Sequence, residues 1–354
     1  MVSCRLLVDI CLMITPSAAI PLAWPDMSVR AAESVFHWLR KMRIMKNQNI
    51  LVGHAAILIA EGDSLTYYDF GRYTIPDGQG RARCAWTDPM LQMETKPQWD
   101  DQGNLCNMEA IAWELESMAE ATHGEHTLYA SILKDVDVVK TRAYCTSIIE
   151  RGYMPYNGLT KNTHNNCARF VAKAILAGLE PGTKMYKRYK WPVSFAPSPY
   201  SNVATAMPNG KHFRMLKGKG SWYHTSLIEP VWDICKKAYA SFSISRSKQL
   251  PSDAVVTYLK APDVNPATVP ESSVYLGGTG EGCFYHAEIA GEALSVTRFS
   301  YKGDKDYQAH YQVDEKTLEA FRADECHVVH DSHLAWITLQ YPKTGSRIRC
   351  RKIT

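Results

Sequence analysis

The stretch ILVGHAAILIAEGDSLTYYDFGRY, residues 50–73, constrains the fold more than any other part of the sequence. Its apolar run from Ile50 to Ala60 predicts a buried strand, and Gly62-Asp63 is a two-residue turn signal. The aromatic, β-rich run from Leu65 to Tyr73 predicts a strand that returns beside the first. These residues therefore predict an antiparallel hairpin at the centre of a sheet.

The short turn also predicts the register of this hairpin. A two-residue turn pairs Glu61 with Ser64 and, counted outward along both strands, Ala56 with Asp69. Side chains alternate between the two faces of a strand, so His54 and Asp69 are expected on one face of neighbouring strands. A shift of one residue would move Asp69 to the other face, so this expectation depends on the turn.

A second constellation follows about a hundred residues later in THNNCARFVAKAILAGLEPG, residues 163–182. Asn165 and Asn166 are good helix N-caps, an apolar stripe follows, and Gly178 marks the helix end. Cys167 is thus expected in the first helical turn. There the helix dipole lowers a thiol pKa from ~8.5, and free N–H groups can receive an oxyanion. The thiol could equally be a buried hydrophobe, a metal ligand or half of a disulfide.

A nucleophilic thiol needs a base, and His54 is the histidine that interrupts an apolar run. Burying an unsatisfied polar group costs ~1–3 kcal/mol, so an imidazole in a buried strand needs a hydrogen-bond partner or a function. Asp69 could hold the tautomer that accepts the proton of Cys167. A satisfied core histidine is the simpler reading of His54, and His164 is an alternative base.

The motifs VGHAAILI…LTYYDFGRY and NNCARFVAKAIL together resemble the circularly permuted branch of the NlpC-type papain-like superfamily, which includes LRAT-like and YiiX-like proteins. They are also similar to an uncharacterised bacterial family within that superfamily. In this branch the histidine-bearing strand precedes the cysteine-bearing helix. The resemblance covers roughly residues 20–205. It implies a nucleophile at Cys167, a base at His54 and an orienting residue at Asp69.

The expected fold class is α+β, with two domains. A circularly permuted papain-like domain is expected over residues 20–210, and a smaller, mainly antiparallel β domain over residues 218–354. Short runs that alternate with Gly, Asp and Lys turns support the second. Further patterns predict helices over 28–46, 108–121 and 141–151, a long loop over 74–106 and a wrapping connection over 186–208.

Three residues are candidates for contacting a substrate: Arg72, Tyr156 and Asn166. Arg72 follows the hairpin together with Arg81 and Arg83, and these arginines would either bind an anionic substrate or be solvated. Tyr156 would either wall a groove or pack in the core. Asn166 directly precedes the thiol.

No metal or organic cofactor is expected. The cluster ECHVVHDSH (Cys326, His327, His330, His333) is the best metal candidate, but no second cluster completes four ligands. The ten cysteines contain no C-x-x-C and indicate mostly reduced thiols. A net charge of +4 gives no indication of a nucleic-acid partner.

The N-terminal segment CRLLVDICLMITPSAAIPLAW is ambiguous. Its apolar run is typical of a signal peptide, but Asp9 interrupts it and Arg5 is its one basic residue. The segment is too short and broken for a membrane-spanning helix. A cytoplasmic location is expected, with secretion to the periplasm or beyond as the alternative.

These features predict a thiol-dependent hydrolase or acyl transferase that cleaves an amide or ester bond through Cys167 and His54. The alternative is a non-catalytic papain-like scaffold that acts as a binding module. Small-molecule, peptide and lipid substrates all fit the same pair, and the oligomeric state is open.

Overall fold

A computed structural model describes residues 15–353, apart from residues 32–33, 46–47, 158–163, 194–196, 207–209, 227, 244–246 and 253–255. The hairpin forms as the sequence predicts, from β4 (His54–Glu61) and β5 (Ser64–Gly71). Glu61 pairs with Ser64 and Ala56 with Asp69, so the predicted register is confirmed. The turn therefore places His54 and Asp69 on one face.

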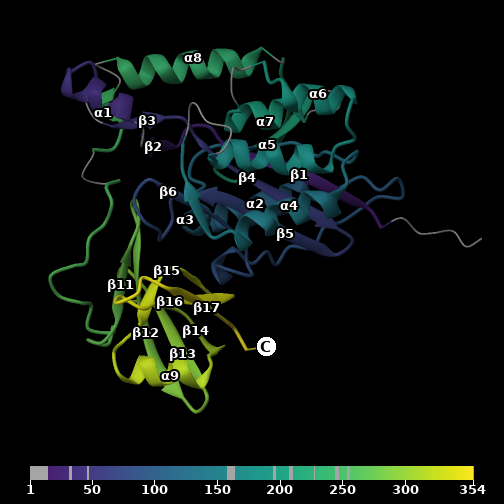
Figure 1. Cartoon of the computed structure of the whole chain (residues 1–354). Helices are drawn as coiled ribbons and strands as arrows, with labels where there is room; N and C mark the ends of the chain where they lie inside the picture. The colour runs from purple at the N-terminus through teal and green to yellow at the C-terminus, as the bar shows by residue number, and fades with distance from the viewer. Residues whose placement is uncertain are drawn as a thin grey trace, which may run out of the picture.

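The hairpin lies inside an eight-stranded antiparallel sheet with the order β10-β9-β7-β1-β4-β5-β6-β8 (Figure 1). β1 pairs along the whole of β4, which leaves both strands buried. The other strands of this sheet are β1 (Ser17–Trp24), β6 (Gln79–Arg83), β7 (Leu128–Ala130), β8 (Tyr153–Pro155), β9 (Lys211–Leu216) and β10 (Lys219–His224).

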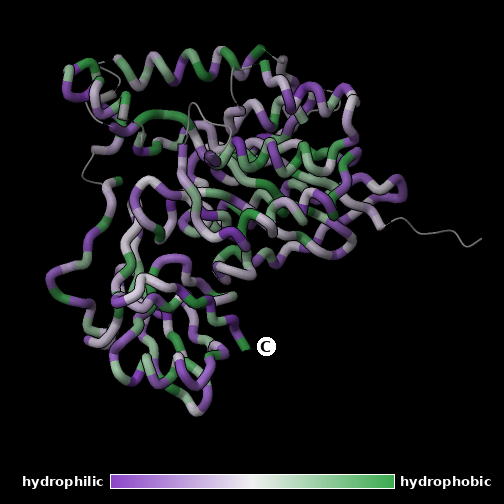
Figure 2. The backbone as a smooth tube through the Cα atoms, viewed as in Figure 1, coloured by the Kyte–Doolittle hydropathy of each residue, from purple (hydrophilic) through white to green (hydrophobic). Residues whose placement is uncertain are grey.

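Helices cover both faces of this sheet (Figure 1). Ile57 and its alternate neighbours pack against α4 (Val138–Glu150) and α5 (Cys167–Gly178). Leu58 and its alternate neighbours pack against α2 (Met108–Ser117) on the opposite face. This two-sided burial explains why the strand is apolar at every position instead of alternating. Figure 2 shows the resulting concentration of hydrophobic residues within the sheet and its helices.

The predicted helix over residues 28–46 is shorter than expected. The strand β2 (Ser28–Arg30) pairs with β3 (Asn49–Leu51), which confines α1 to Ser34–Lys41. The apolar run from Ile50 is also divided, because Gly53 adopts a φ of +80° between β3 and β4. A Cβ atom at Gly53 would lie 2.8 Å from the carbonyl oxygen of Trp24, so the close approach requires glycine.

Two helices lie in the region where a wrapping connection was expected, residues 186–208. α6 (Lys184–Lys190) begins at a Thr183 cap and α7 (Pro199–Thr205) at a Ser198 capping box. A further helix, α8 (Glu229–Phe242), lies in the region predicted to be mainly β. The hairpin of β9 and β10 belongs to the first sheet, so the second sheet begins at Val274 and not near residue 218.

The C-terminal region contains a separate four-stranded antiparallel sheet, a three-stranded sheet and their own apolar core. Its elements are β11 (Val274–Gly277), β12 (Gly282–Ala290), β13 (Ala293–Ser300), β14 (Lys305–Gln312), α9 (Glu315–Arg322), β15 (His327–His333), β16 (Trp336–Gln340) and β17 (Arg347–Arg351). The protein is thus an α+β molecule with a large sheet and a separate smaller antiparallel region.

Smaller elements complete the chain. The expected loop over residues 74–106 contains β6 and a 3₁₀ turn at Pro89–Leu91, and the expected helix over 108–121 is interrupted, with α3 (Ala119–Thr122) following α2. A second 3₁₀ turn spans Ser247–Gln249. Among the described residues, no helix is long and apolar enough to cross a membrane. The first part of the possible signal segment, residues 1–14, lies outside the described residues.

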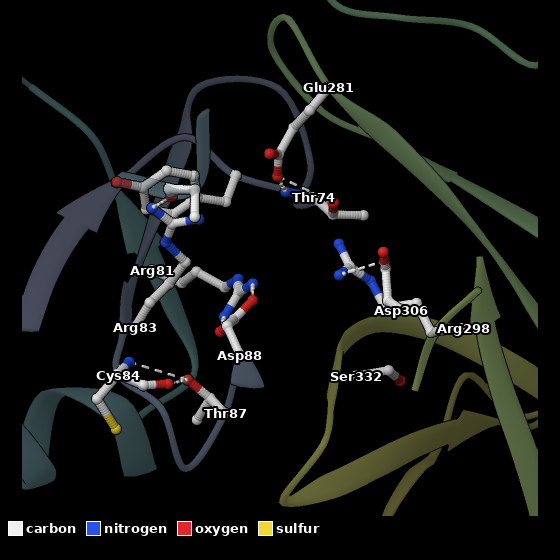
Figure 3. A network of polar contacts seen from close by, with 12 residues as sticks. Thr74, Arg81, Arg83, Cys84, Thr87, Asp88, Glu281, Arg298, Asp306 and Ser332 are labelled. Carbon is white, nitrogen blue, oxygen red and sulfur yellow. Dashed lines mark hydrogen bonds and ion pairs between the residues drawn. The ribbon is translucent and has the colours of Figure 1, made fainter. Parts of the chain in front are cut away.

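The two regions meet through apolar contacts and through polar ones such as that between Glu281 and Thr74, which Figure 3 shows. Trp336 of β16 is fully buried and packs with the core residues of the large sheet. The N–H group of Leu334 donates to the carbonyl of Thr87 at 3.0 Å. Arg349 of β17 donates to the carbonyl of Glu150 at 2.6 Å. These contacts hold the C-terminal region against the loop that follows β6 and against the end of α4.

A buried ion pair joins β6 to the loop that follows it, and its loss should destabilise the protein. Arg81 donates to both carboxylate oxygens of Asp88, at 2.8 and 2.6 Å. We expect Asp88→Ala to lower the free energy of unfolding by about 3–5 kcal/mol, because it leaves a buried guanidinium without its partner. Urea unfolding followed by circular dichroism measures this loss. Asp101→Ala, at an exposed position, is the matched control, and equal loss in both variants would contradict the expectation.

Candidate active site

Cys167 is the first residue of α5. The side chain of Asn166 caps this helix by accepting from the N–H group of Arg169 at 2.8 Å, as the sequence predicts. The thiol is buried, and the backbone N–H groups of Ala55 and Ala168 stabilise its sulfur as an anion. The helix start therefore places the sulfur among positive ends of backbone dipoles.

His54 begins β4, at the point where the sheet meets the start of α5. Its ring is buried and stacks on its cross-strand partner Trp24, with ring centroids 5.8 Å apart. Nε2 of His54 lies 3.5 Å from Oδ2 of Asp69. At this distance the contact is an ion pair more than an aligned hydrogen bond. Nδ1 is the ring nitrogen left to serve the Cys167 thiol, with which His54 also interacts.

Asp69, His54 and Cys167 shift one another's pKa values. Burial alone would lower the pKa of His54, but Asp69 and Cys167 outweigh it and raise that pKa to about 9. Burial alone would raise the pKa of Cys167, but His54 and the backbone N–H groups lower it below its ordinary value. Each charge therefore favours the other: the imidazolium of His54 promotes ionisation of the Cys167 thiol, and the thiolate promotes protonation of His54.

Asp69 is fully buried and is held by three other side chains. Arg83 donates twice to its carboxylate, at 3.1 and 2.7 Å. The hydroxyl groups of Tyr67 and Tyr73 donate to Oδ2 at 3.2 and 2.5 Å. Burial would raise the pKa of Asp69, but Arg83 and His54 hold it well below its ordinary value. The carboxylate is therefore a fixed anion beside His54.

The C-terminal region supports this carboxylate from behind. The ring of Tyr73 stacks on His123 at 5.4 Å, and His123 lies 3.7 Å from the carboxylate of Glu281. Glu281 also accepts hydrogen bonds from the N–H group and the hydroxyl of Thr74. Figure 3 shows Glu281 pointing at Thr74, with Arg83 nearby. A residue of the second region thus contacts the loop that carries Tyr73.

A cavity of about 500 Å³ is lined by Cys167. Asn166, Tyr156 and Gly53 also line it, as do residues of α1, β3 and α8. A small molecule bound there would lie beside Cys167.

Of the three residues predicted to contact a substrate, two line the cavity and one does not. Tyr156 and Asn166 line the cavity. The Arg72 guanidinium instead lies 5.0 Å from the centroid of the Tyr156 ring and donates to the carbonyl of Arg30. Arg81 and Arg83 are buried in ion pairs. The reading of these two arginines as solvated or substrate-binding is wrong, because each neutralises a buried carboxylate.

The alternative base and the possible metal cluster can also be located. Nδ1 of His164 is buried and has no hydrogen-bond partner among the residues that the structure describes. The cluster at 326–333 lies largely on β15, where His330 bonds the carbonyl of Gly277 at 2.9 Å and His333 packs on Trp336. Within the described ranges, no three His, Cys, Asp or Glu side chains are grouped to hold a metal ion.

Sequence reasoning missed Trp24, both tyrosines at Asp69, and the pairing of Arg83 with that carboxylate. Tyr67 has the same parity as Asp69 on β5, so the alternation that placed Asp69 could have found it. Arg83 pairs with Asp69 across β5 and β6, but no turn signal fixes that register from the sequence. Trp24 lies opposite His54 on a strand that the sequence did not separate from a possible signal segment.

The fold and site together define an α+β protein with a cysteine, a histidine and an aspartate in one buried row. Residues 19–183 match a family model described as "Type VI secretion system effector TseH-like". Residues 273–349 match one described as "DUF6695 C-terminal domain".

A crystal structure of the type VI secretion system effector TseH is also similar. Its sequence is 16% identical, the match covers 59% of this chain and 98% of that one, and the TM-score is 0.40. None of the curated proteins compared matches the chain. The N-terminal match thus contains His54 and Asp69 as well as Cys167.

The charge coupling at the site gives a testable pH dependence. We expect iodoacetamide to alkylate Cys167 rapidly well below pH ~8.5, the ordinary thiol pKa, because the imidazolium of His54 keeps the sulfur ionised. His54→Gln should move the midpoint of the alkylation rate upward toward that value. Peptide mass spectrometry over a pH series measures both, with exposed Cys106 in the same molecule as the reference. Equal pH profiles for Cys167 in wild type and variant would contradict the coupling.

Proposed function

We propose that this protein is a thiol-dependent hydrolase or acyl transferase that cleaves an amide or ester bond. The observation that carries the proposal is the row formed by Cys167, His54 and Asp69, with a cavity that Cys167 helps to line. A thiol, a base and an orienting carboxylate in contact are the parts that nucleophilic acyl transfer requires.

The proposed reaction uses only groups of the chain. The Cys167 thiolate attacks the carbonyl carbon, and the N–H group of Cys167 helps to hold the oxyanion. The imidazolium of His54 gives its proton to the leaving nitrogen or oxygen, which leaves an acyl thioester. Neutral His54 then takes a proton from water or from a second acceptor, which attacks the thioester and restores the thiolate. Asp69 holds the ring orientation throughout.

The order of these residues supports a circularly permuted papain-like arrangement. The strand that carries His54 comes first in the chain, the strand that carries Asp69 follows, and the helix that begins with Cys167 comes last. The resemblance seen in the sequence implies the same order. We therefore propose the permuted NlpC-type class for the N-terminal region.

The match to effectors extends the proposal to a biological role. Because residues 19–183 match the TseH-like effector model, we propose that the chain is likewise an effector of a type VI secretion system. In this proposal the protein is located in the cytoplasm of the cell that produces it.

Growth of a bacterial host measures this role. We expect wild-type protein to inhibit growth when it is expressed, either in the cytoplasm or with an export signal, and Cys167→Ala to abolish the inhibition, because no acyl-enzyme can form. Cys106→Ala, an exposed thiol outside the site, is the matched control and should inhibit growth like wild type. Immunoblots confirm equal amounts of each variant.

One result would favour the non-catalytic alternative. If Cys167→Ala and His54→Gln inhibit growth as strongly as wild type, the chain acts by binding and not by chemistry. The compartment in which inhibition appears tests the expected location of the target.

A further inference from the structure

Helix α8 carries a row of exposed apolar side chains on its outer side. Trp232 in this row is 62% exposed, whereas Pro230, Lys237 and Ser241 on the opposite side of the helix are buried. Figure 1 shows α8 along one border of the molecule, and Figure 2 shows hydrophobic and hydrophilic residues alternating along it. We call this row the α8 seam, and it consists of Ile228, directly before the helix, Trp232, Cys235, Tyr239 and Phe242.

The spacing of the α8 seam is typical of a coiled-coil helix. Its residues follow one another at intervals of four, three, four and three. This is the alternation of the core positions a and d in a heptad repeat, which form a narrow stripe that packs against a second helix. The d positions are then Ile228, Cys235 and Phe242, and the a positions are Trp232 and Tyr239. The spacing therefore indicates that the partner of the seam is a helix.

The charged residues beside the seam indicate which helix this is. Glu229 and Lys236 are exposed and occupy the two e positions, seven residues apart. Between antiparallel helices the e positions face each other, so a second copy of α8 brings Glu229 beside the partner's Lys236, and two-fold symmetry repeats the contact. In a parallel pair the e positions would instead face the g positions, Val231 and Ala238, which are uncharged. Charge complementarity thus favours two antiparallel copies, in which the helix dipoles are also opposed.

The same register gives well-matched apolar layers. When Glu229 lies beside the partner's Lys236, Trp232 lies opposite the partner's Cys235, and Ile228 lies opposite the partner's Tyr239. Each layer then joins a larger side chain to a smaller one, as close packing between two helices requires. Tryptophan and tyrosine are also enriched in the buried centres of protein interfaces. Charge and side-chain volume therefore select the same register.

The neighbouring helix α1 extends the apolar surface. Val35, Trp38 and Met42 are exposed on it, and Trp38 is 55% exposed. Figure 1 shows α1 on the same border of the molecule as α8. A stable interface buries roughly 800 Å² on each partner. A contact centred on the α8 seam can reach this size by including α1.

We propose that two copies of this chain associate through the α8 seam, with the two helices antiparallel about a two-fold axis. An unrelated protein would need charges in the matching order, whereas a second copy supplies them by symmetry. A bilayer would cover the apolar row, but it would give no role to opposite charges at the two e positions. Lys237 and Ser241 line the cavity from the side of α8 opposite the seam, so each copy keeps its own cavity. The inference is independent of the proposed thiol chemistry.

Sedimentation velocity of the full-length protein over a range of concentrations tests the association. A reducing agent is present, so that the exposed Cys235 forms no disulfide. We expect a dimer that dissociates on dilution. Trp232→Glu places a carboxylate in the apolar seam of both copies and should weaken the dimer more than about tenfold. Trp113→Glu is the matched control, because Trp113 is 52% exposed but lies on α2, and it should dimerise like wild type.

A charge exchange tests the register. Glu229→Lys sets a lysine beside the partner's Lys236 at two places and should weaken the dimer about tenfold. Lys236→Glu should do the same. The double variant Glu229→Lys with Lys236→Glu restores opposite charges and should restore the dimer. Both residues are exposed, so all three variants should keep the circular dichroism spectrum of the wild type.

The remaining outcomes each overturn the proposal. A protein that stays monomeric at every concentration has no such contact, and a dimer that Trp232→Glu leaves intact is held together elsewhere. If the double charge variant dimerises as weakly as the single ones, the antiparallel pairing is wrong. A monomer that sediments with phosphatidylglycerol vesicles, and loses this binding through Trp232→Glu, would make the seam a surface for membranes and not for a second copy.

Discussion

The buried pair of Asp69 and Arg83 is the interaction on which the rest of the site depends. A carboxylate with no exposed surface is stable only when its charge is compensated and its oxygens are hydrogen-bonded. β6 supplies the guanidinium, and two tyrosines supply the remaining donors. The compensated anion can then remain charged beside His54 and raise its pKa. The imidazolium in turn favours the thiolate at Cys167.

The C-terminal region is part of this arrangement because it contacts the loop that follows β5. Gly278 allows its backbone to approach Tyr73 and Thr74 so closely that a Cβ atom would lie 3.0 Å from the Tyr73 carbonyl oxygen. Glu281 then reaches Thr74 and His123. Tyr73 stacks on His123, and Glu281 of the C-terminal region lies beside His123. Removing that region would therefore take away the carboxylate that holds the stacking partner of Tyr73. Such contacts make the smaller sheets a support for the orientation of Asp69, in addition to any binding role of their own.

Local signals predicted the parts of the site that depend on local geometry. A two-residue turn fixed the partner of Asp69, and an asparagine cap placed Cys167 at a helix start, because both effects act within a few residues. The role of Arg83 depends on β6 lying beside β5, a pairing across a longer connection. The helices α6 and α7 were missed for a different reason: proline, serine and aromatic residues suggested an irregular connection, whereas caps at Thr183 and Ser198 begin helices there. The helix α8 was missed because short alternating runs predicted a mainly β region from residue 218 onward.

The amphipathic pattern of α8 was hard to use for another physical reason. Periodicity predicts that one face of a helix is apolar, but it assumes that this face is buried. In α8 the pair Asp233–Lys237 and Ser241 face inward and the tryptophan face is exposed. Burying the inner pair carries a desolvation cost that the mutual attraction of the two charges only partly offsets, since burial raises the pKa of Asp233 and lowers the pKa of Lys237. Exposing the outer stripe also leaves apolar area in water at ~25 cal/mol per Å².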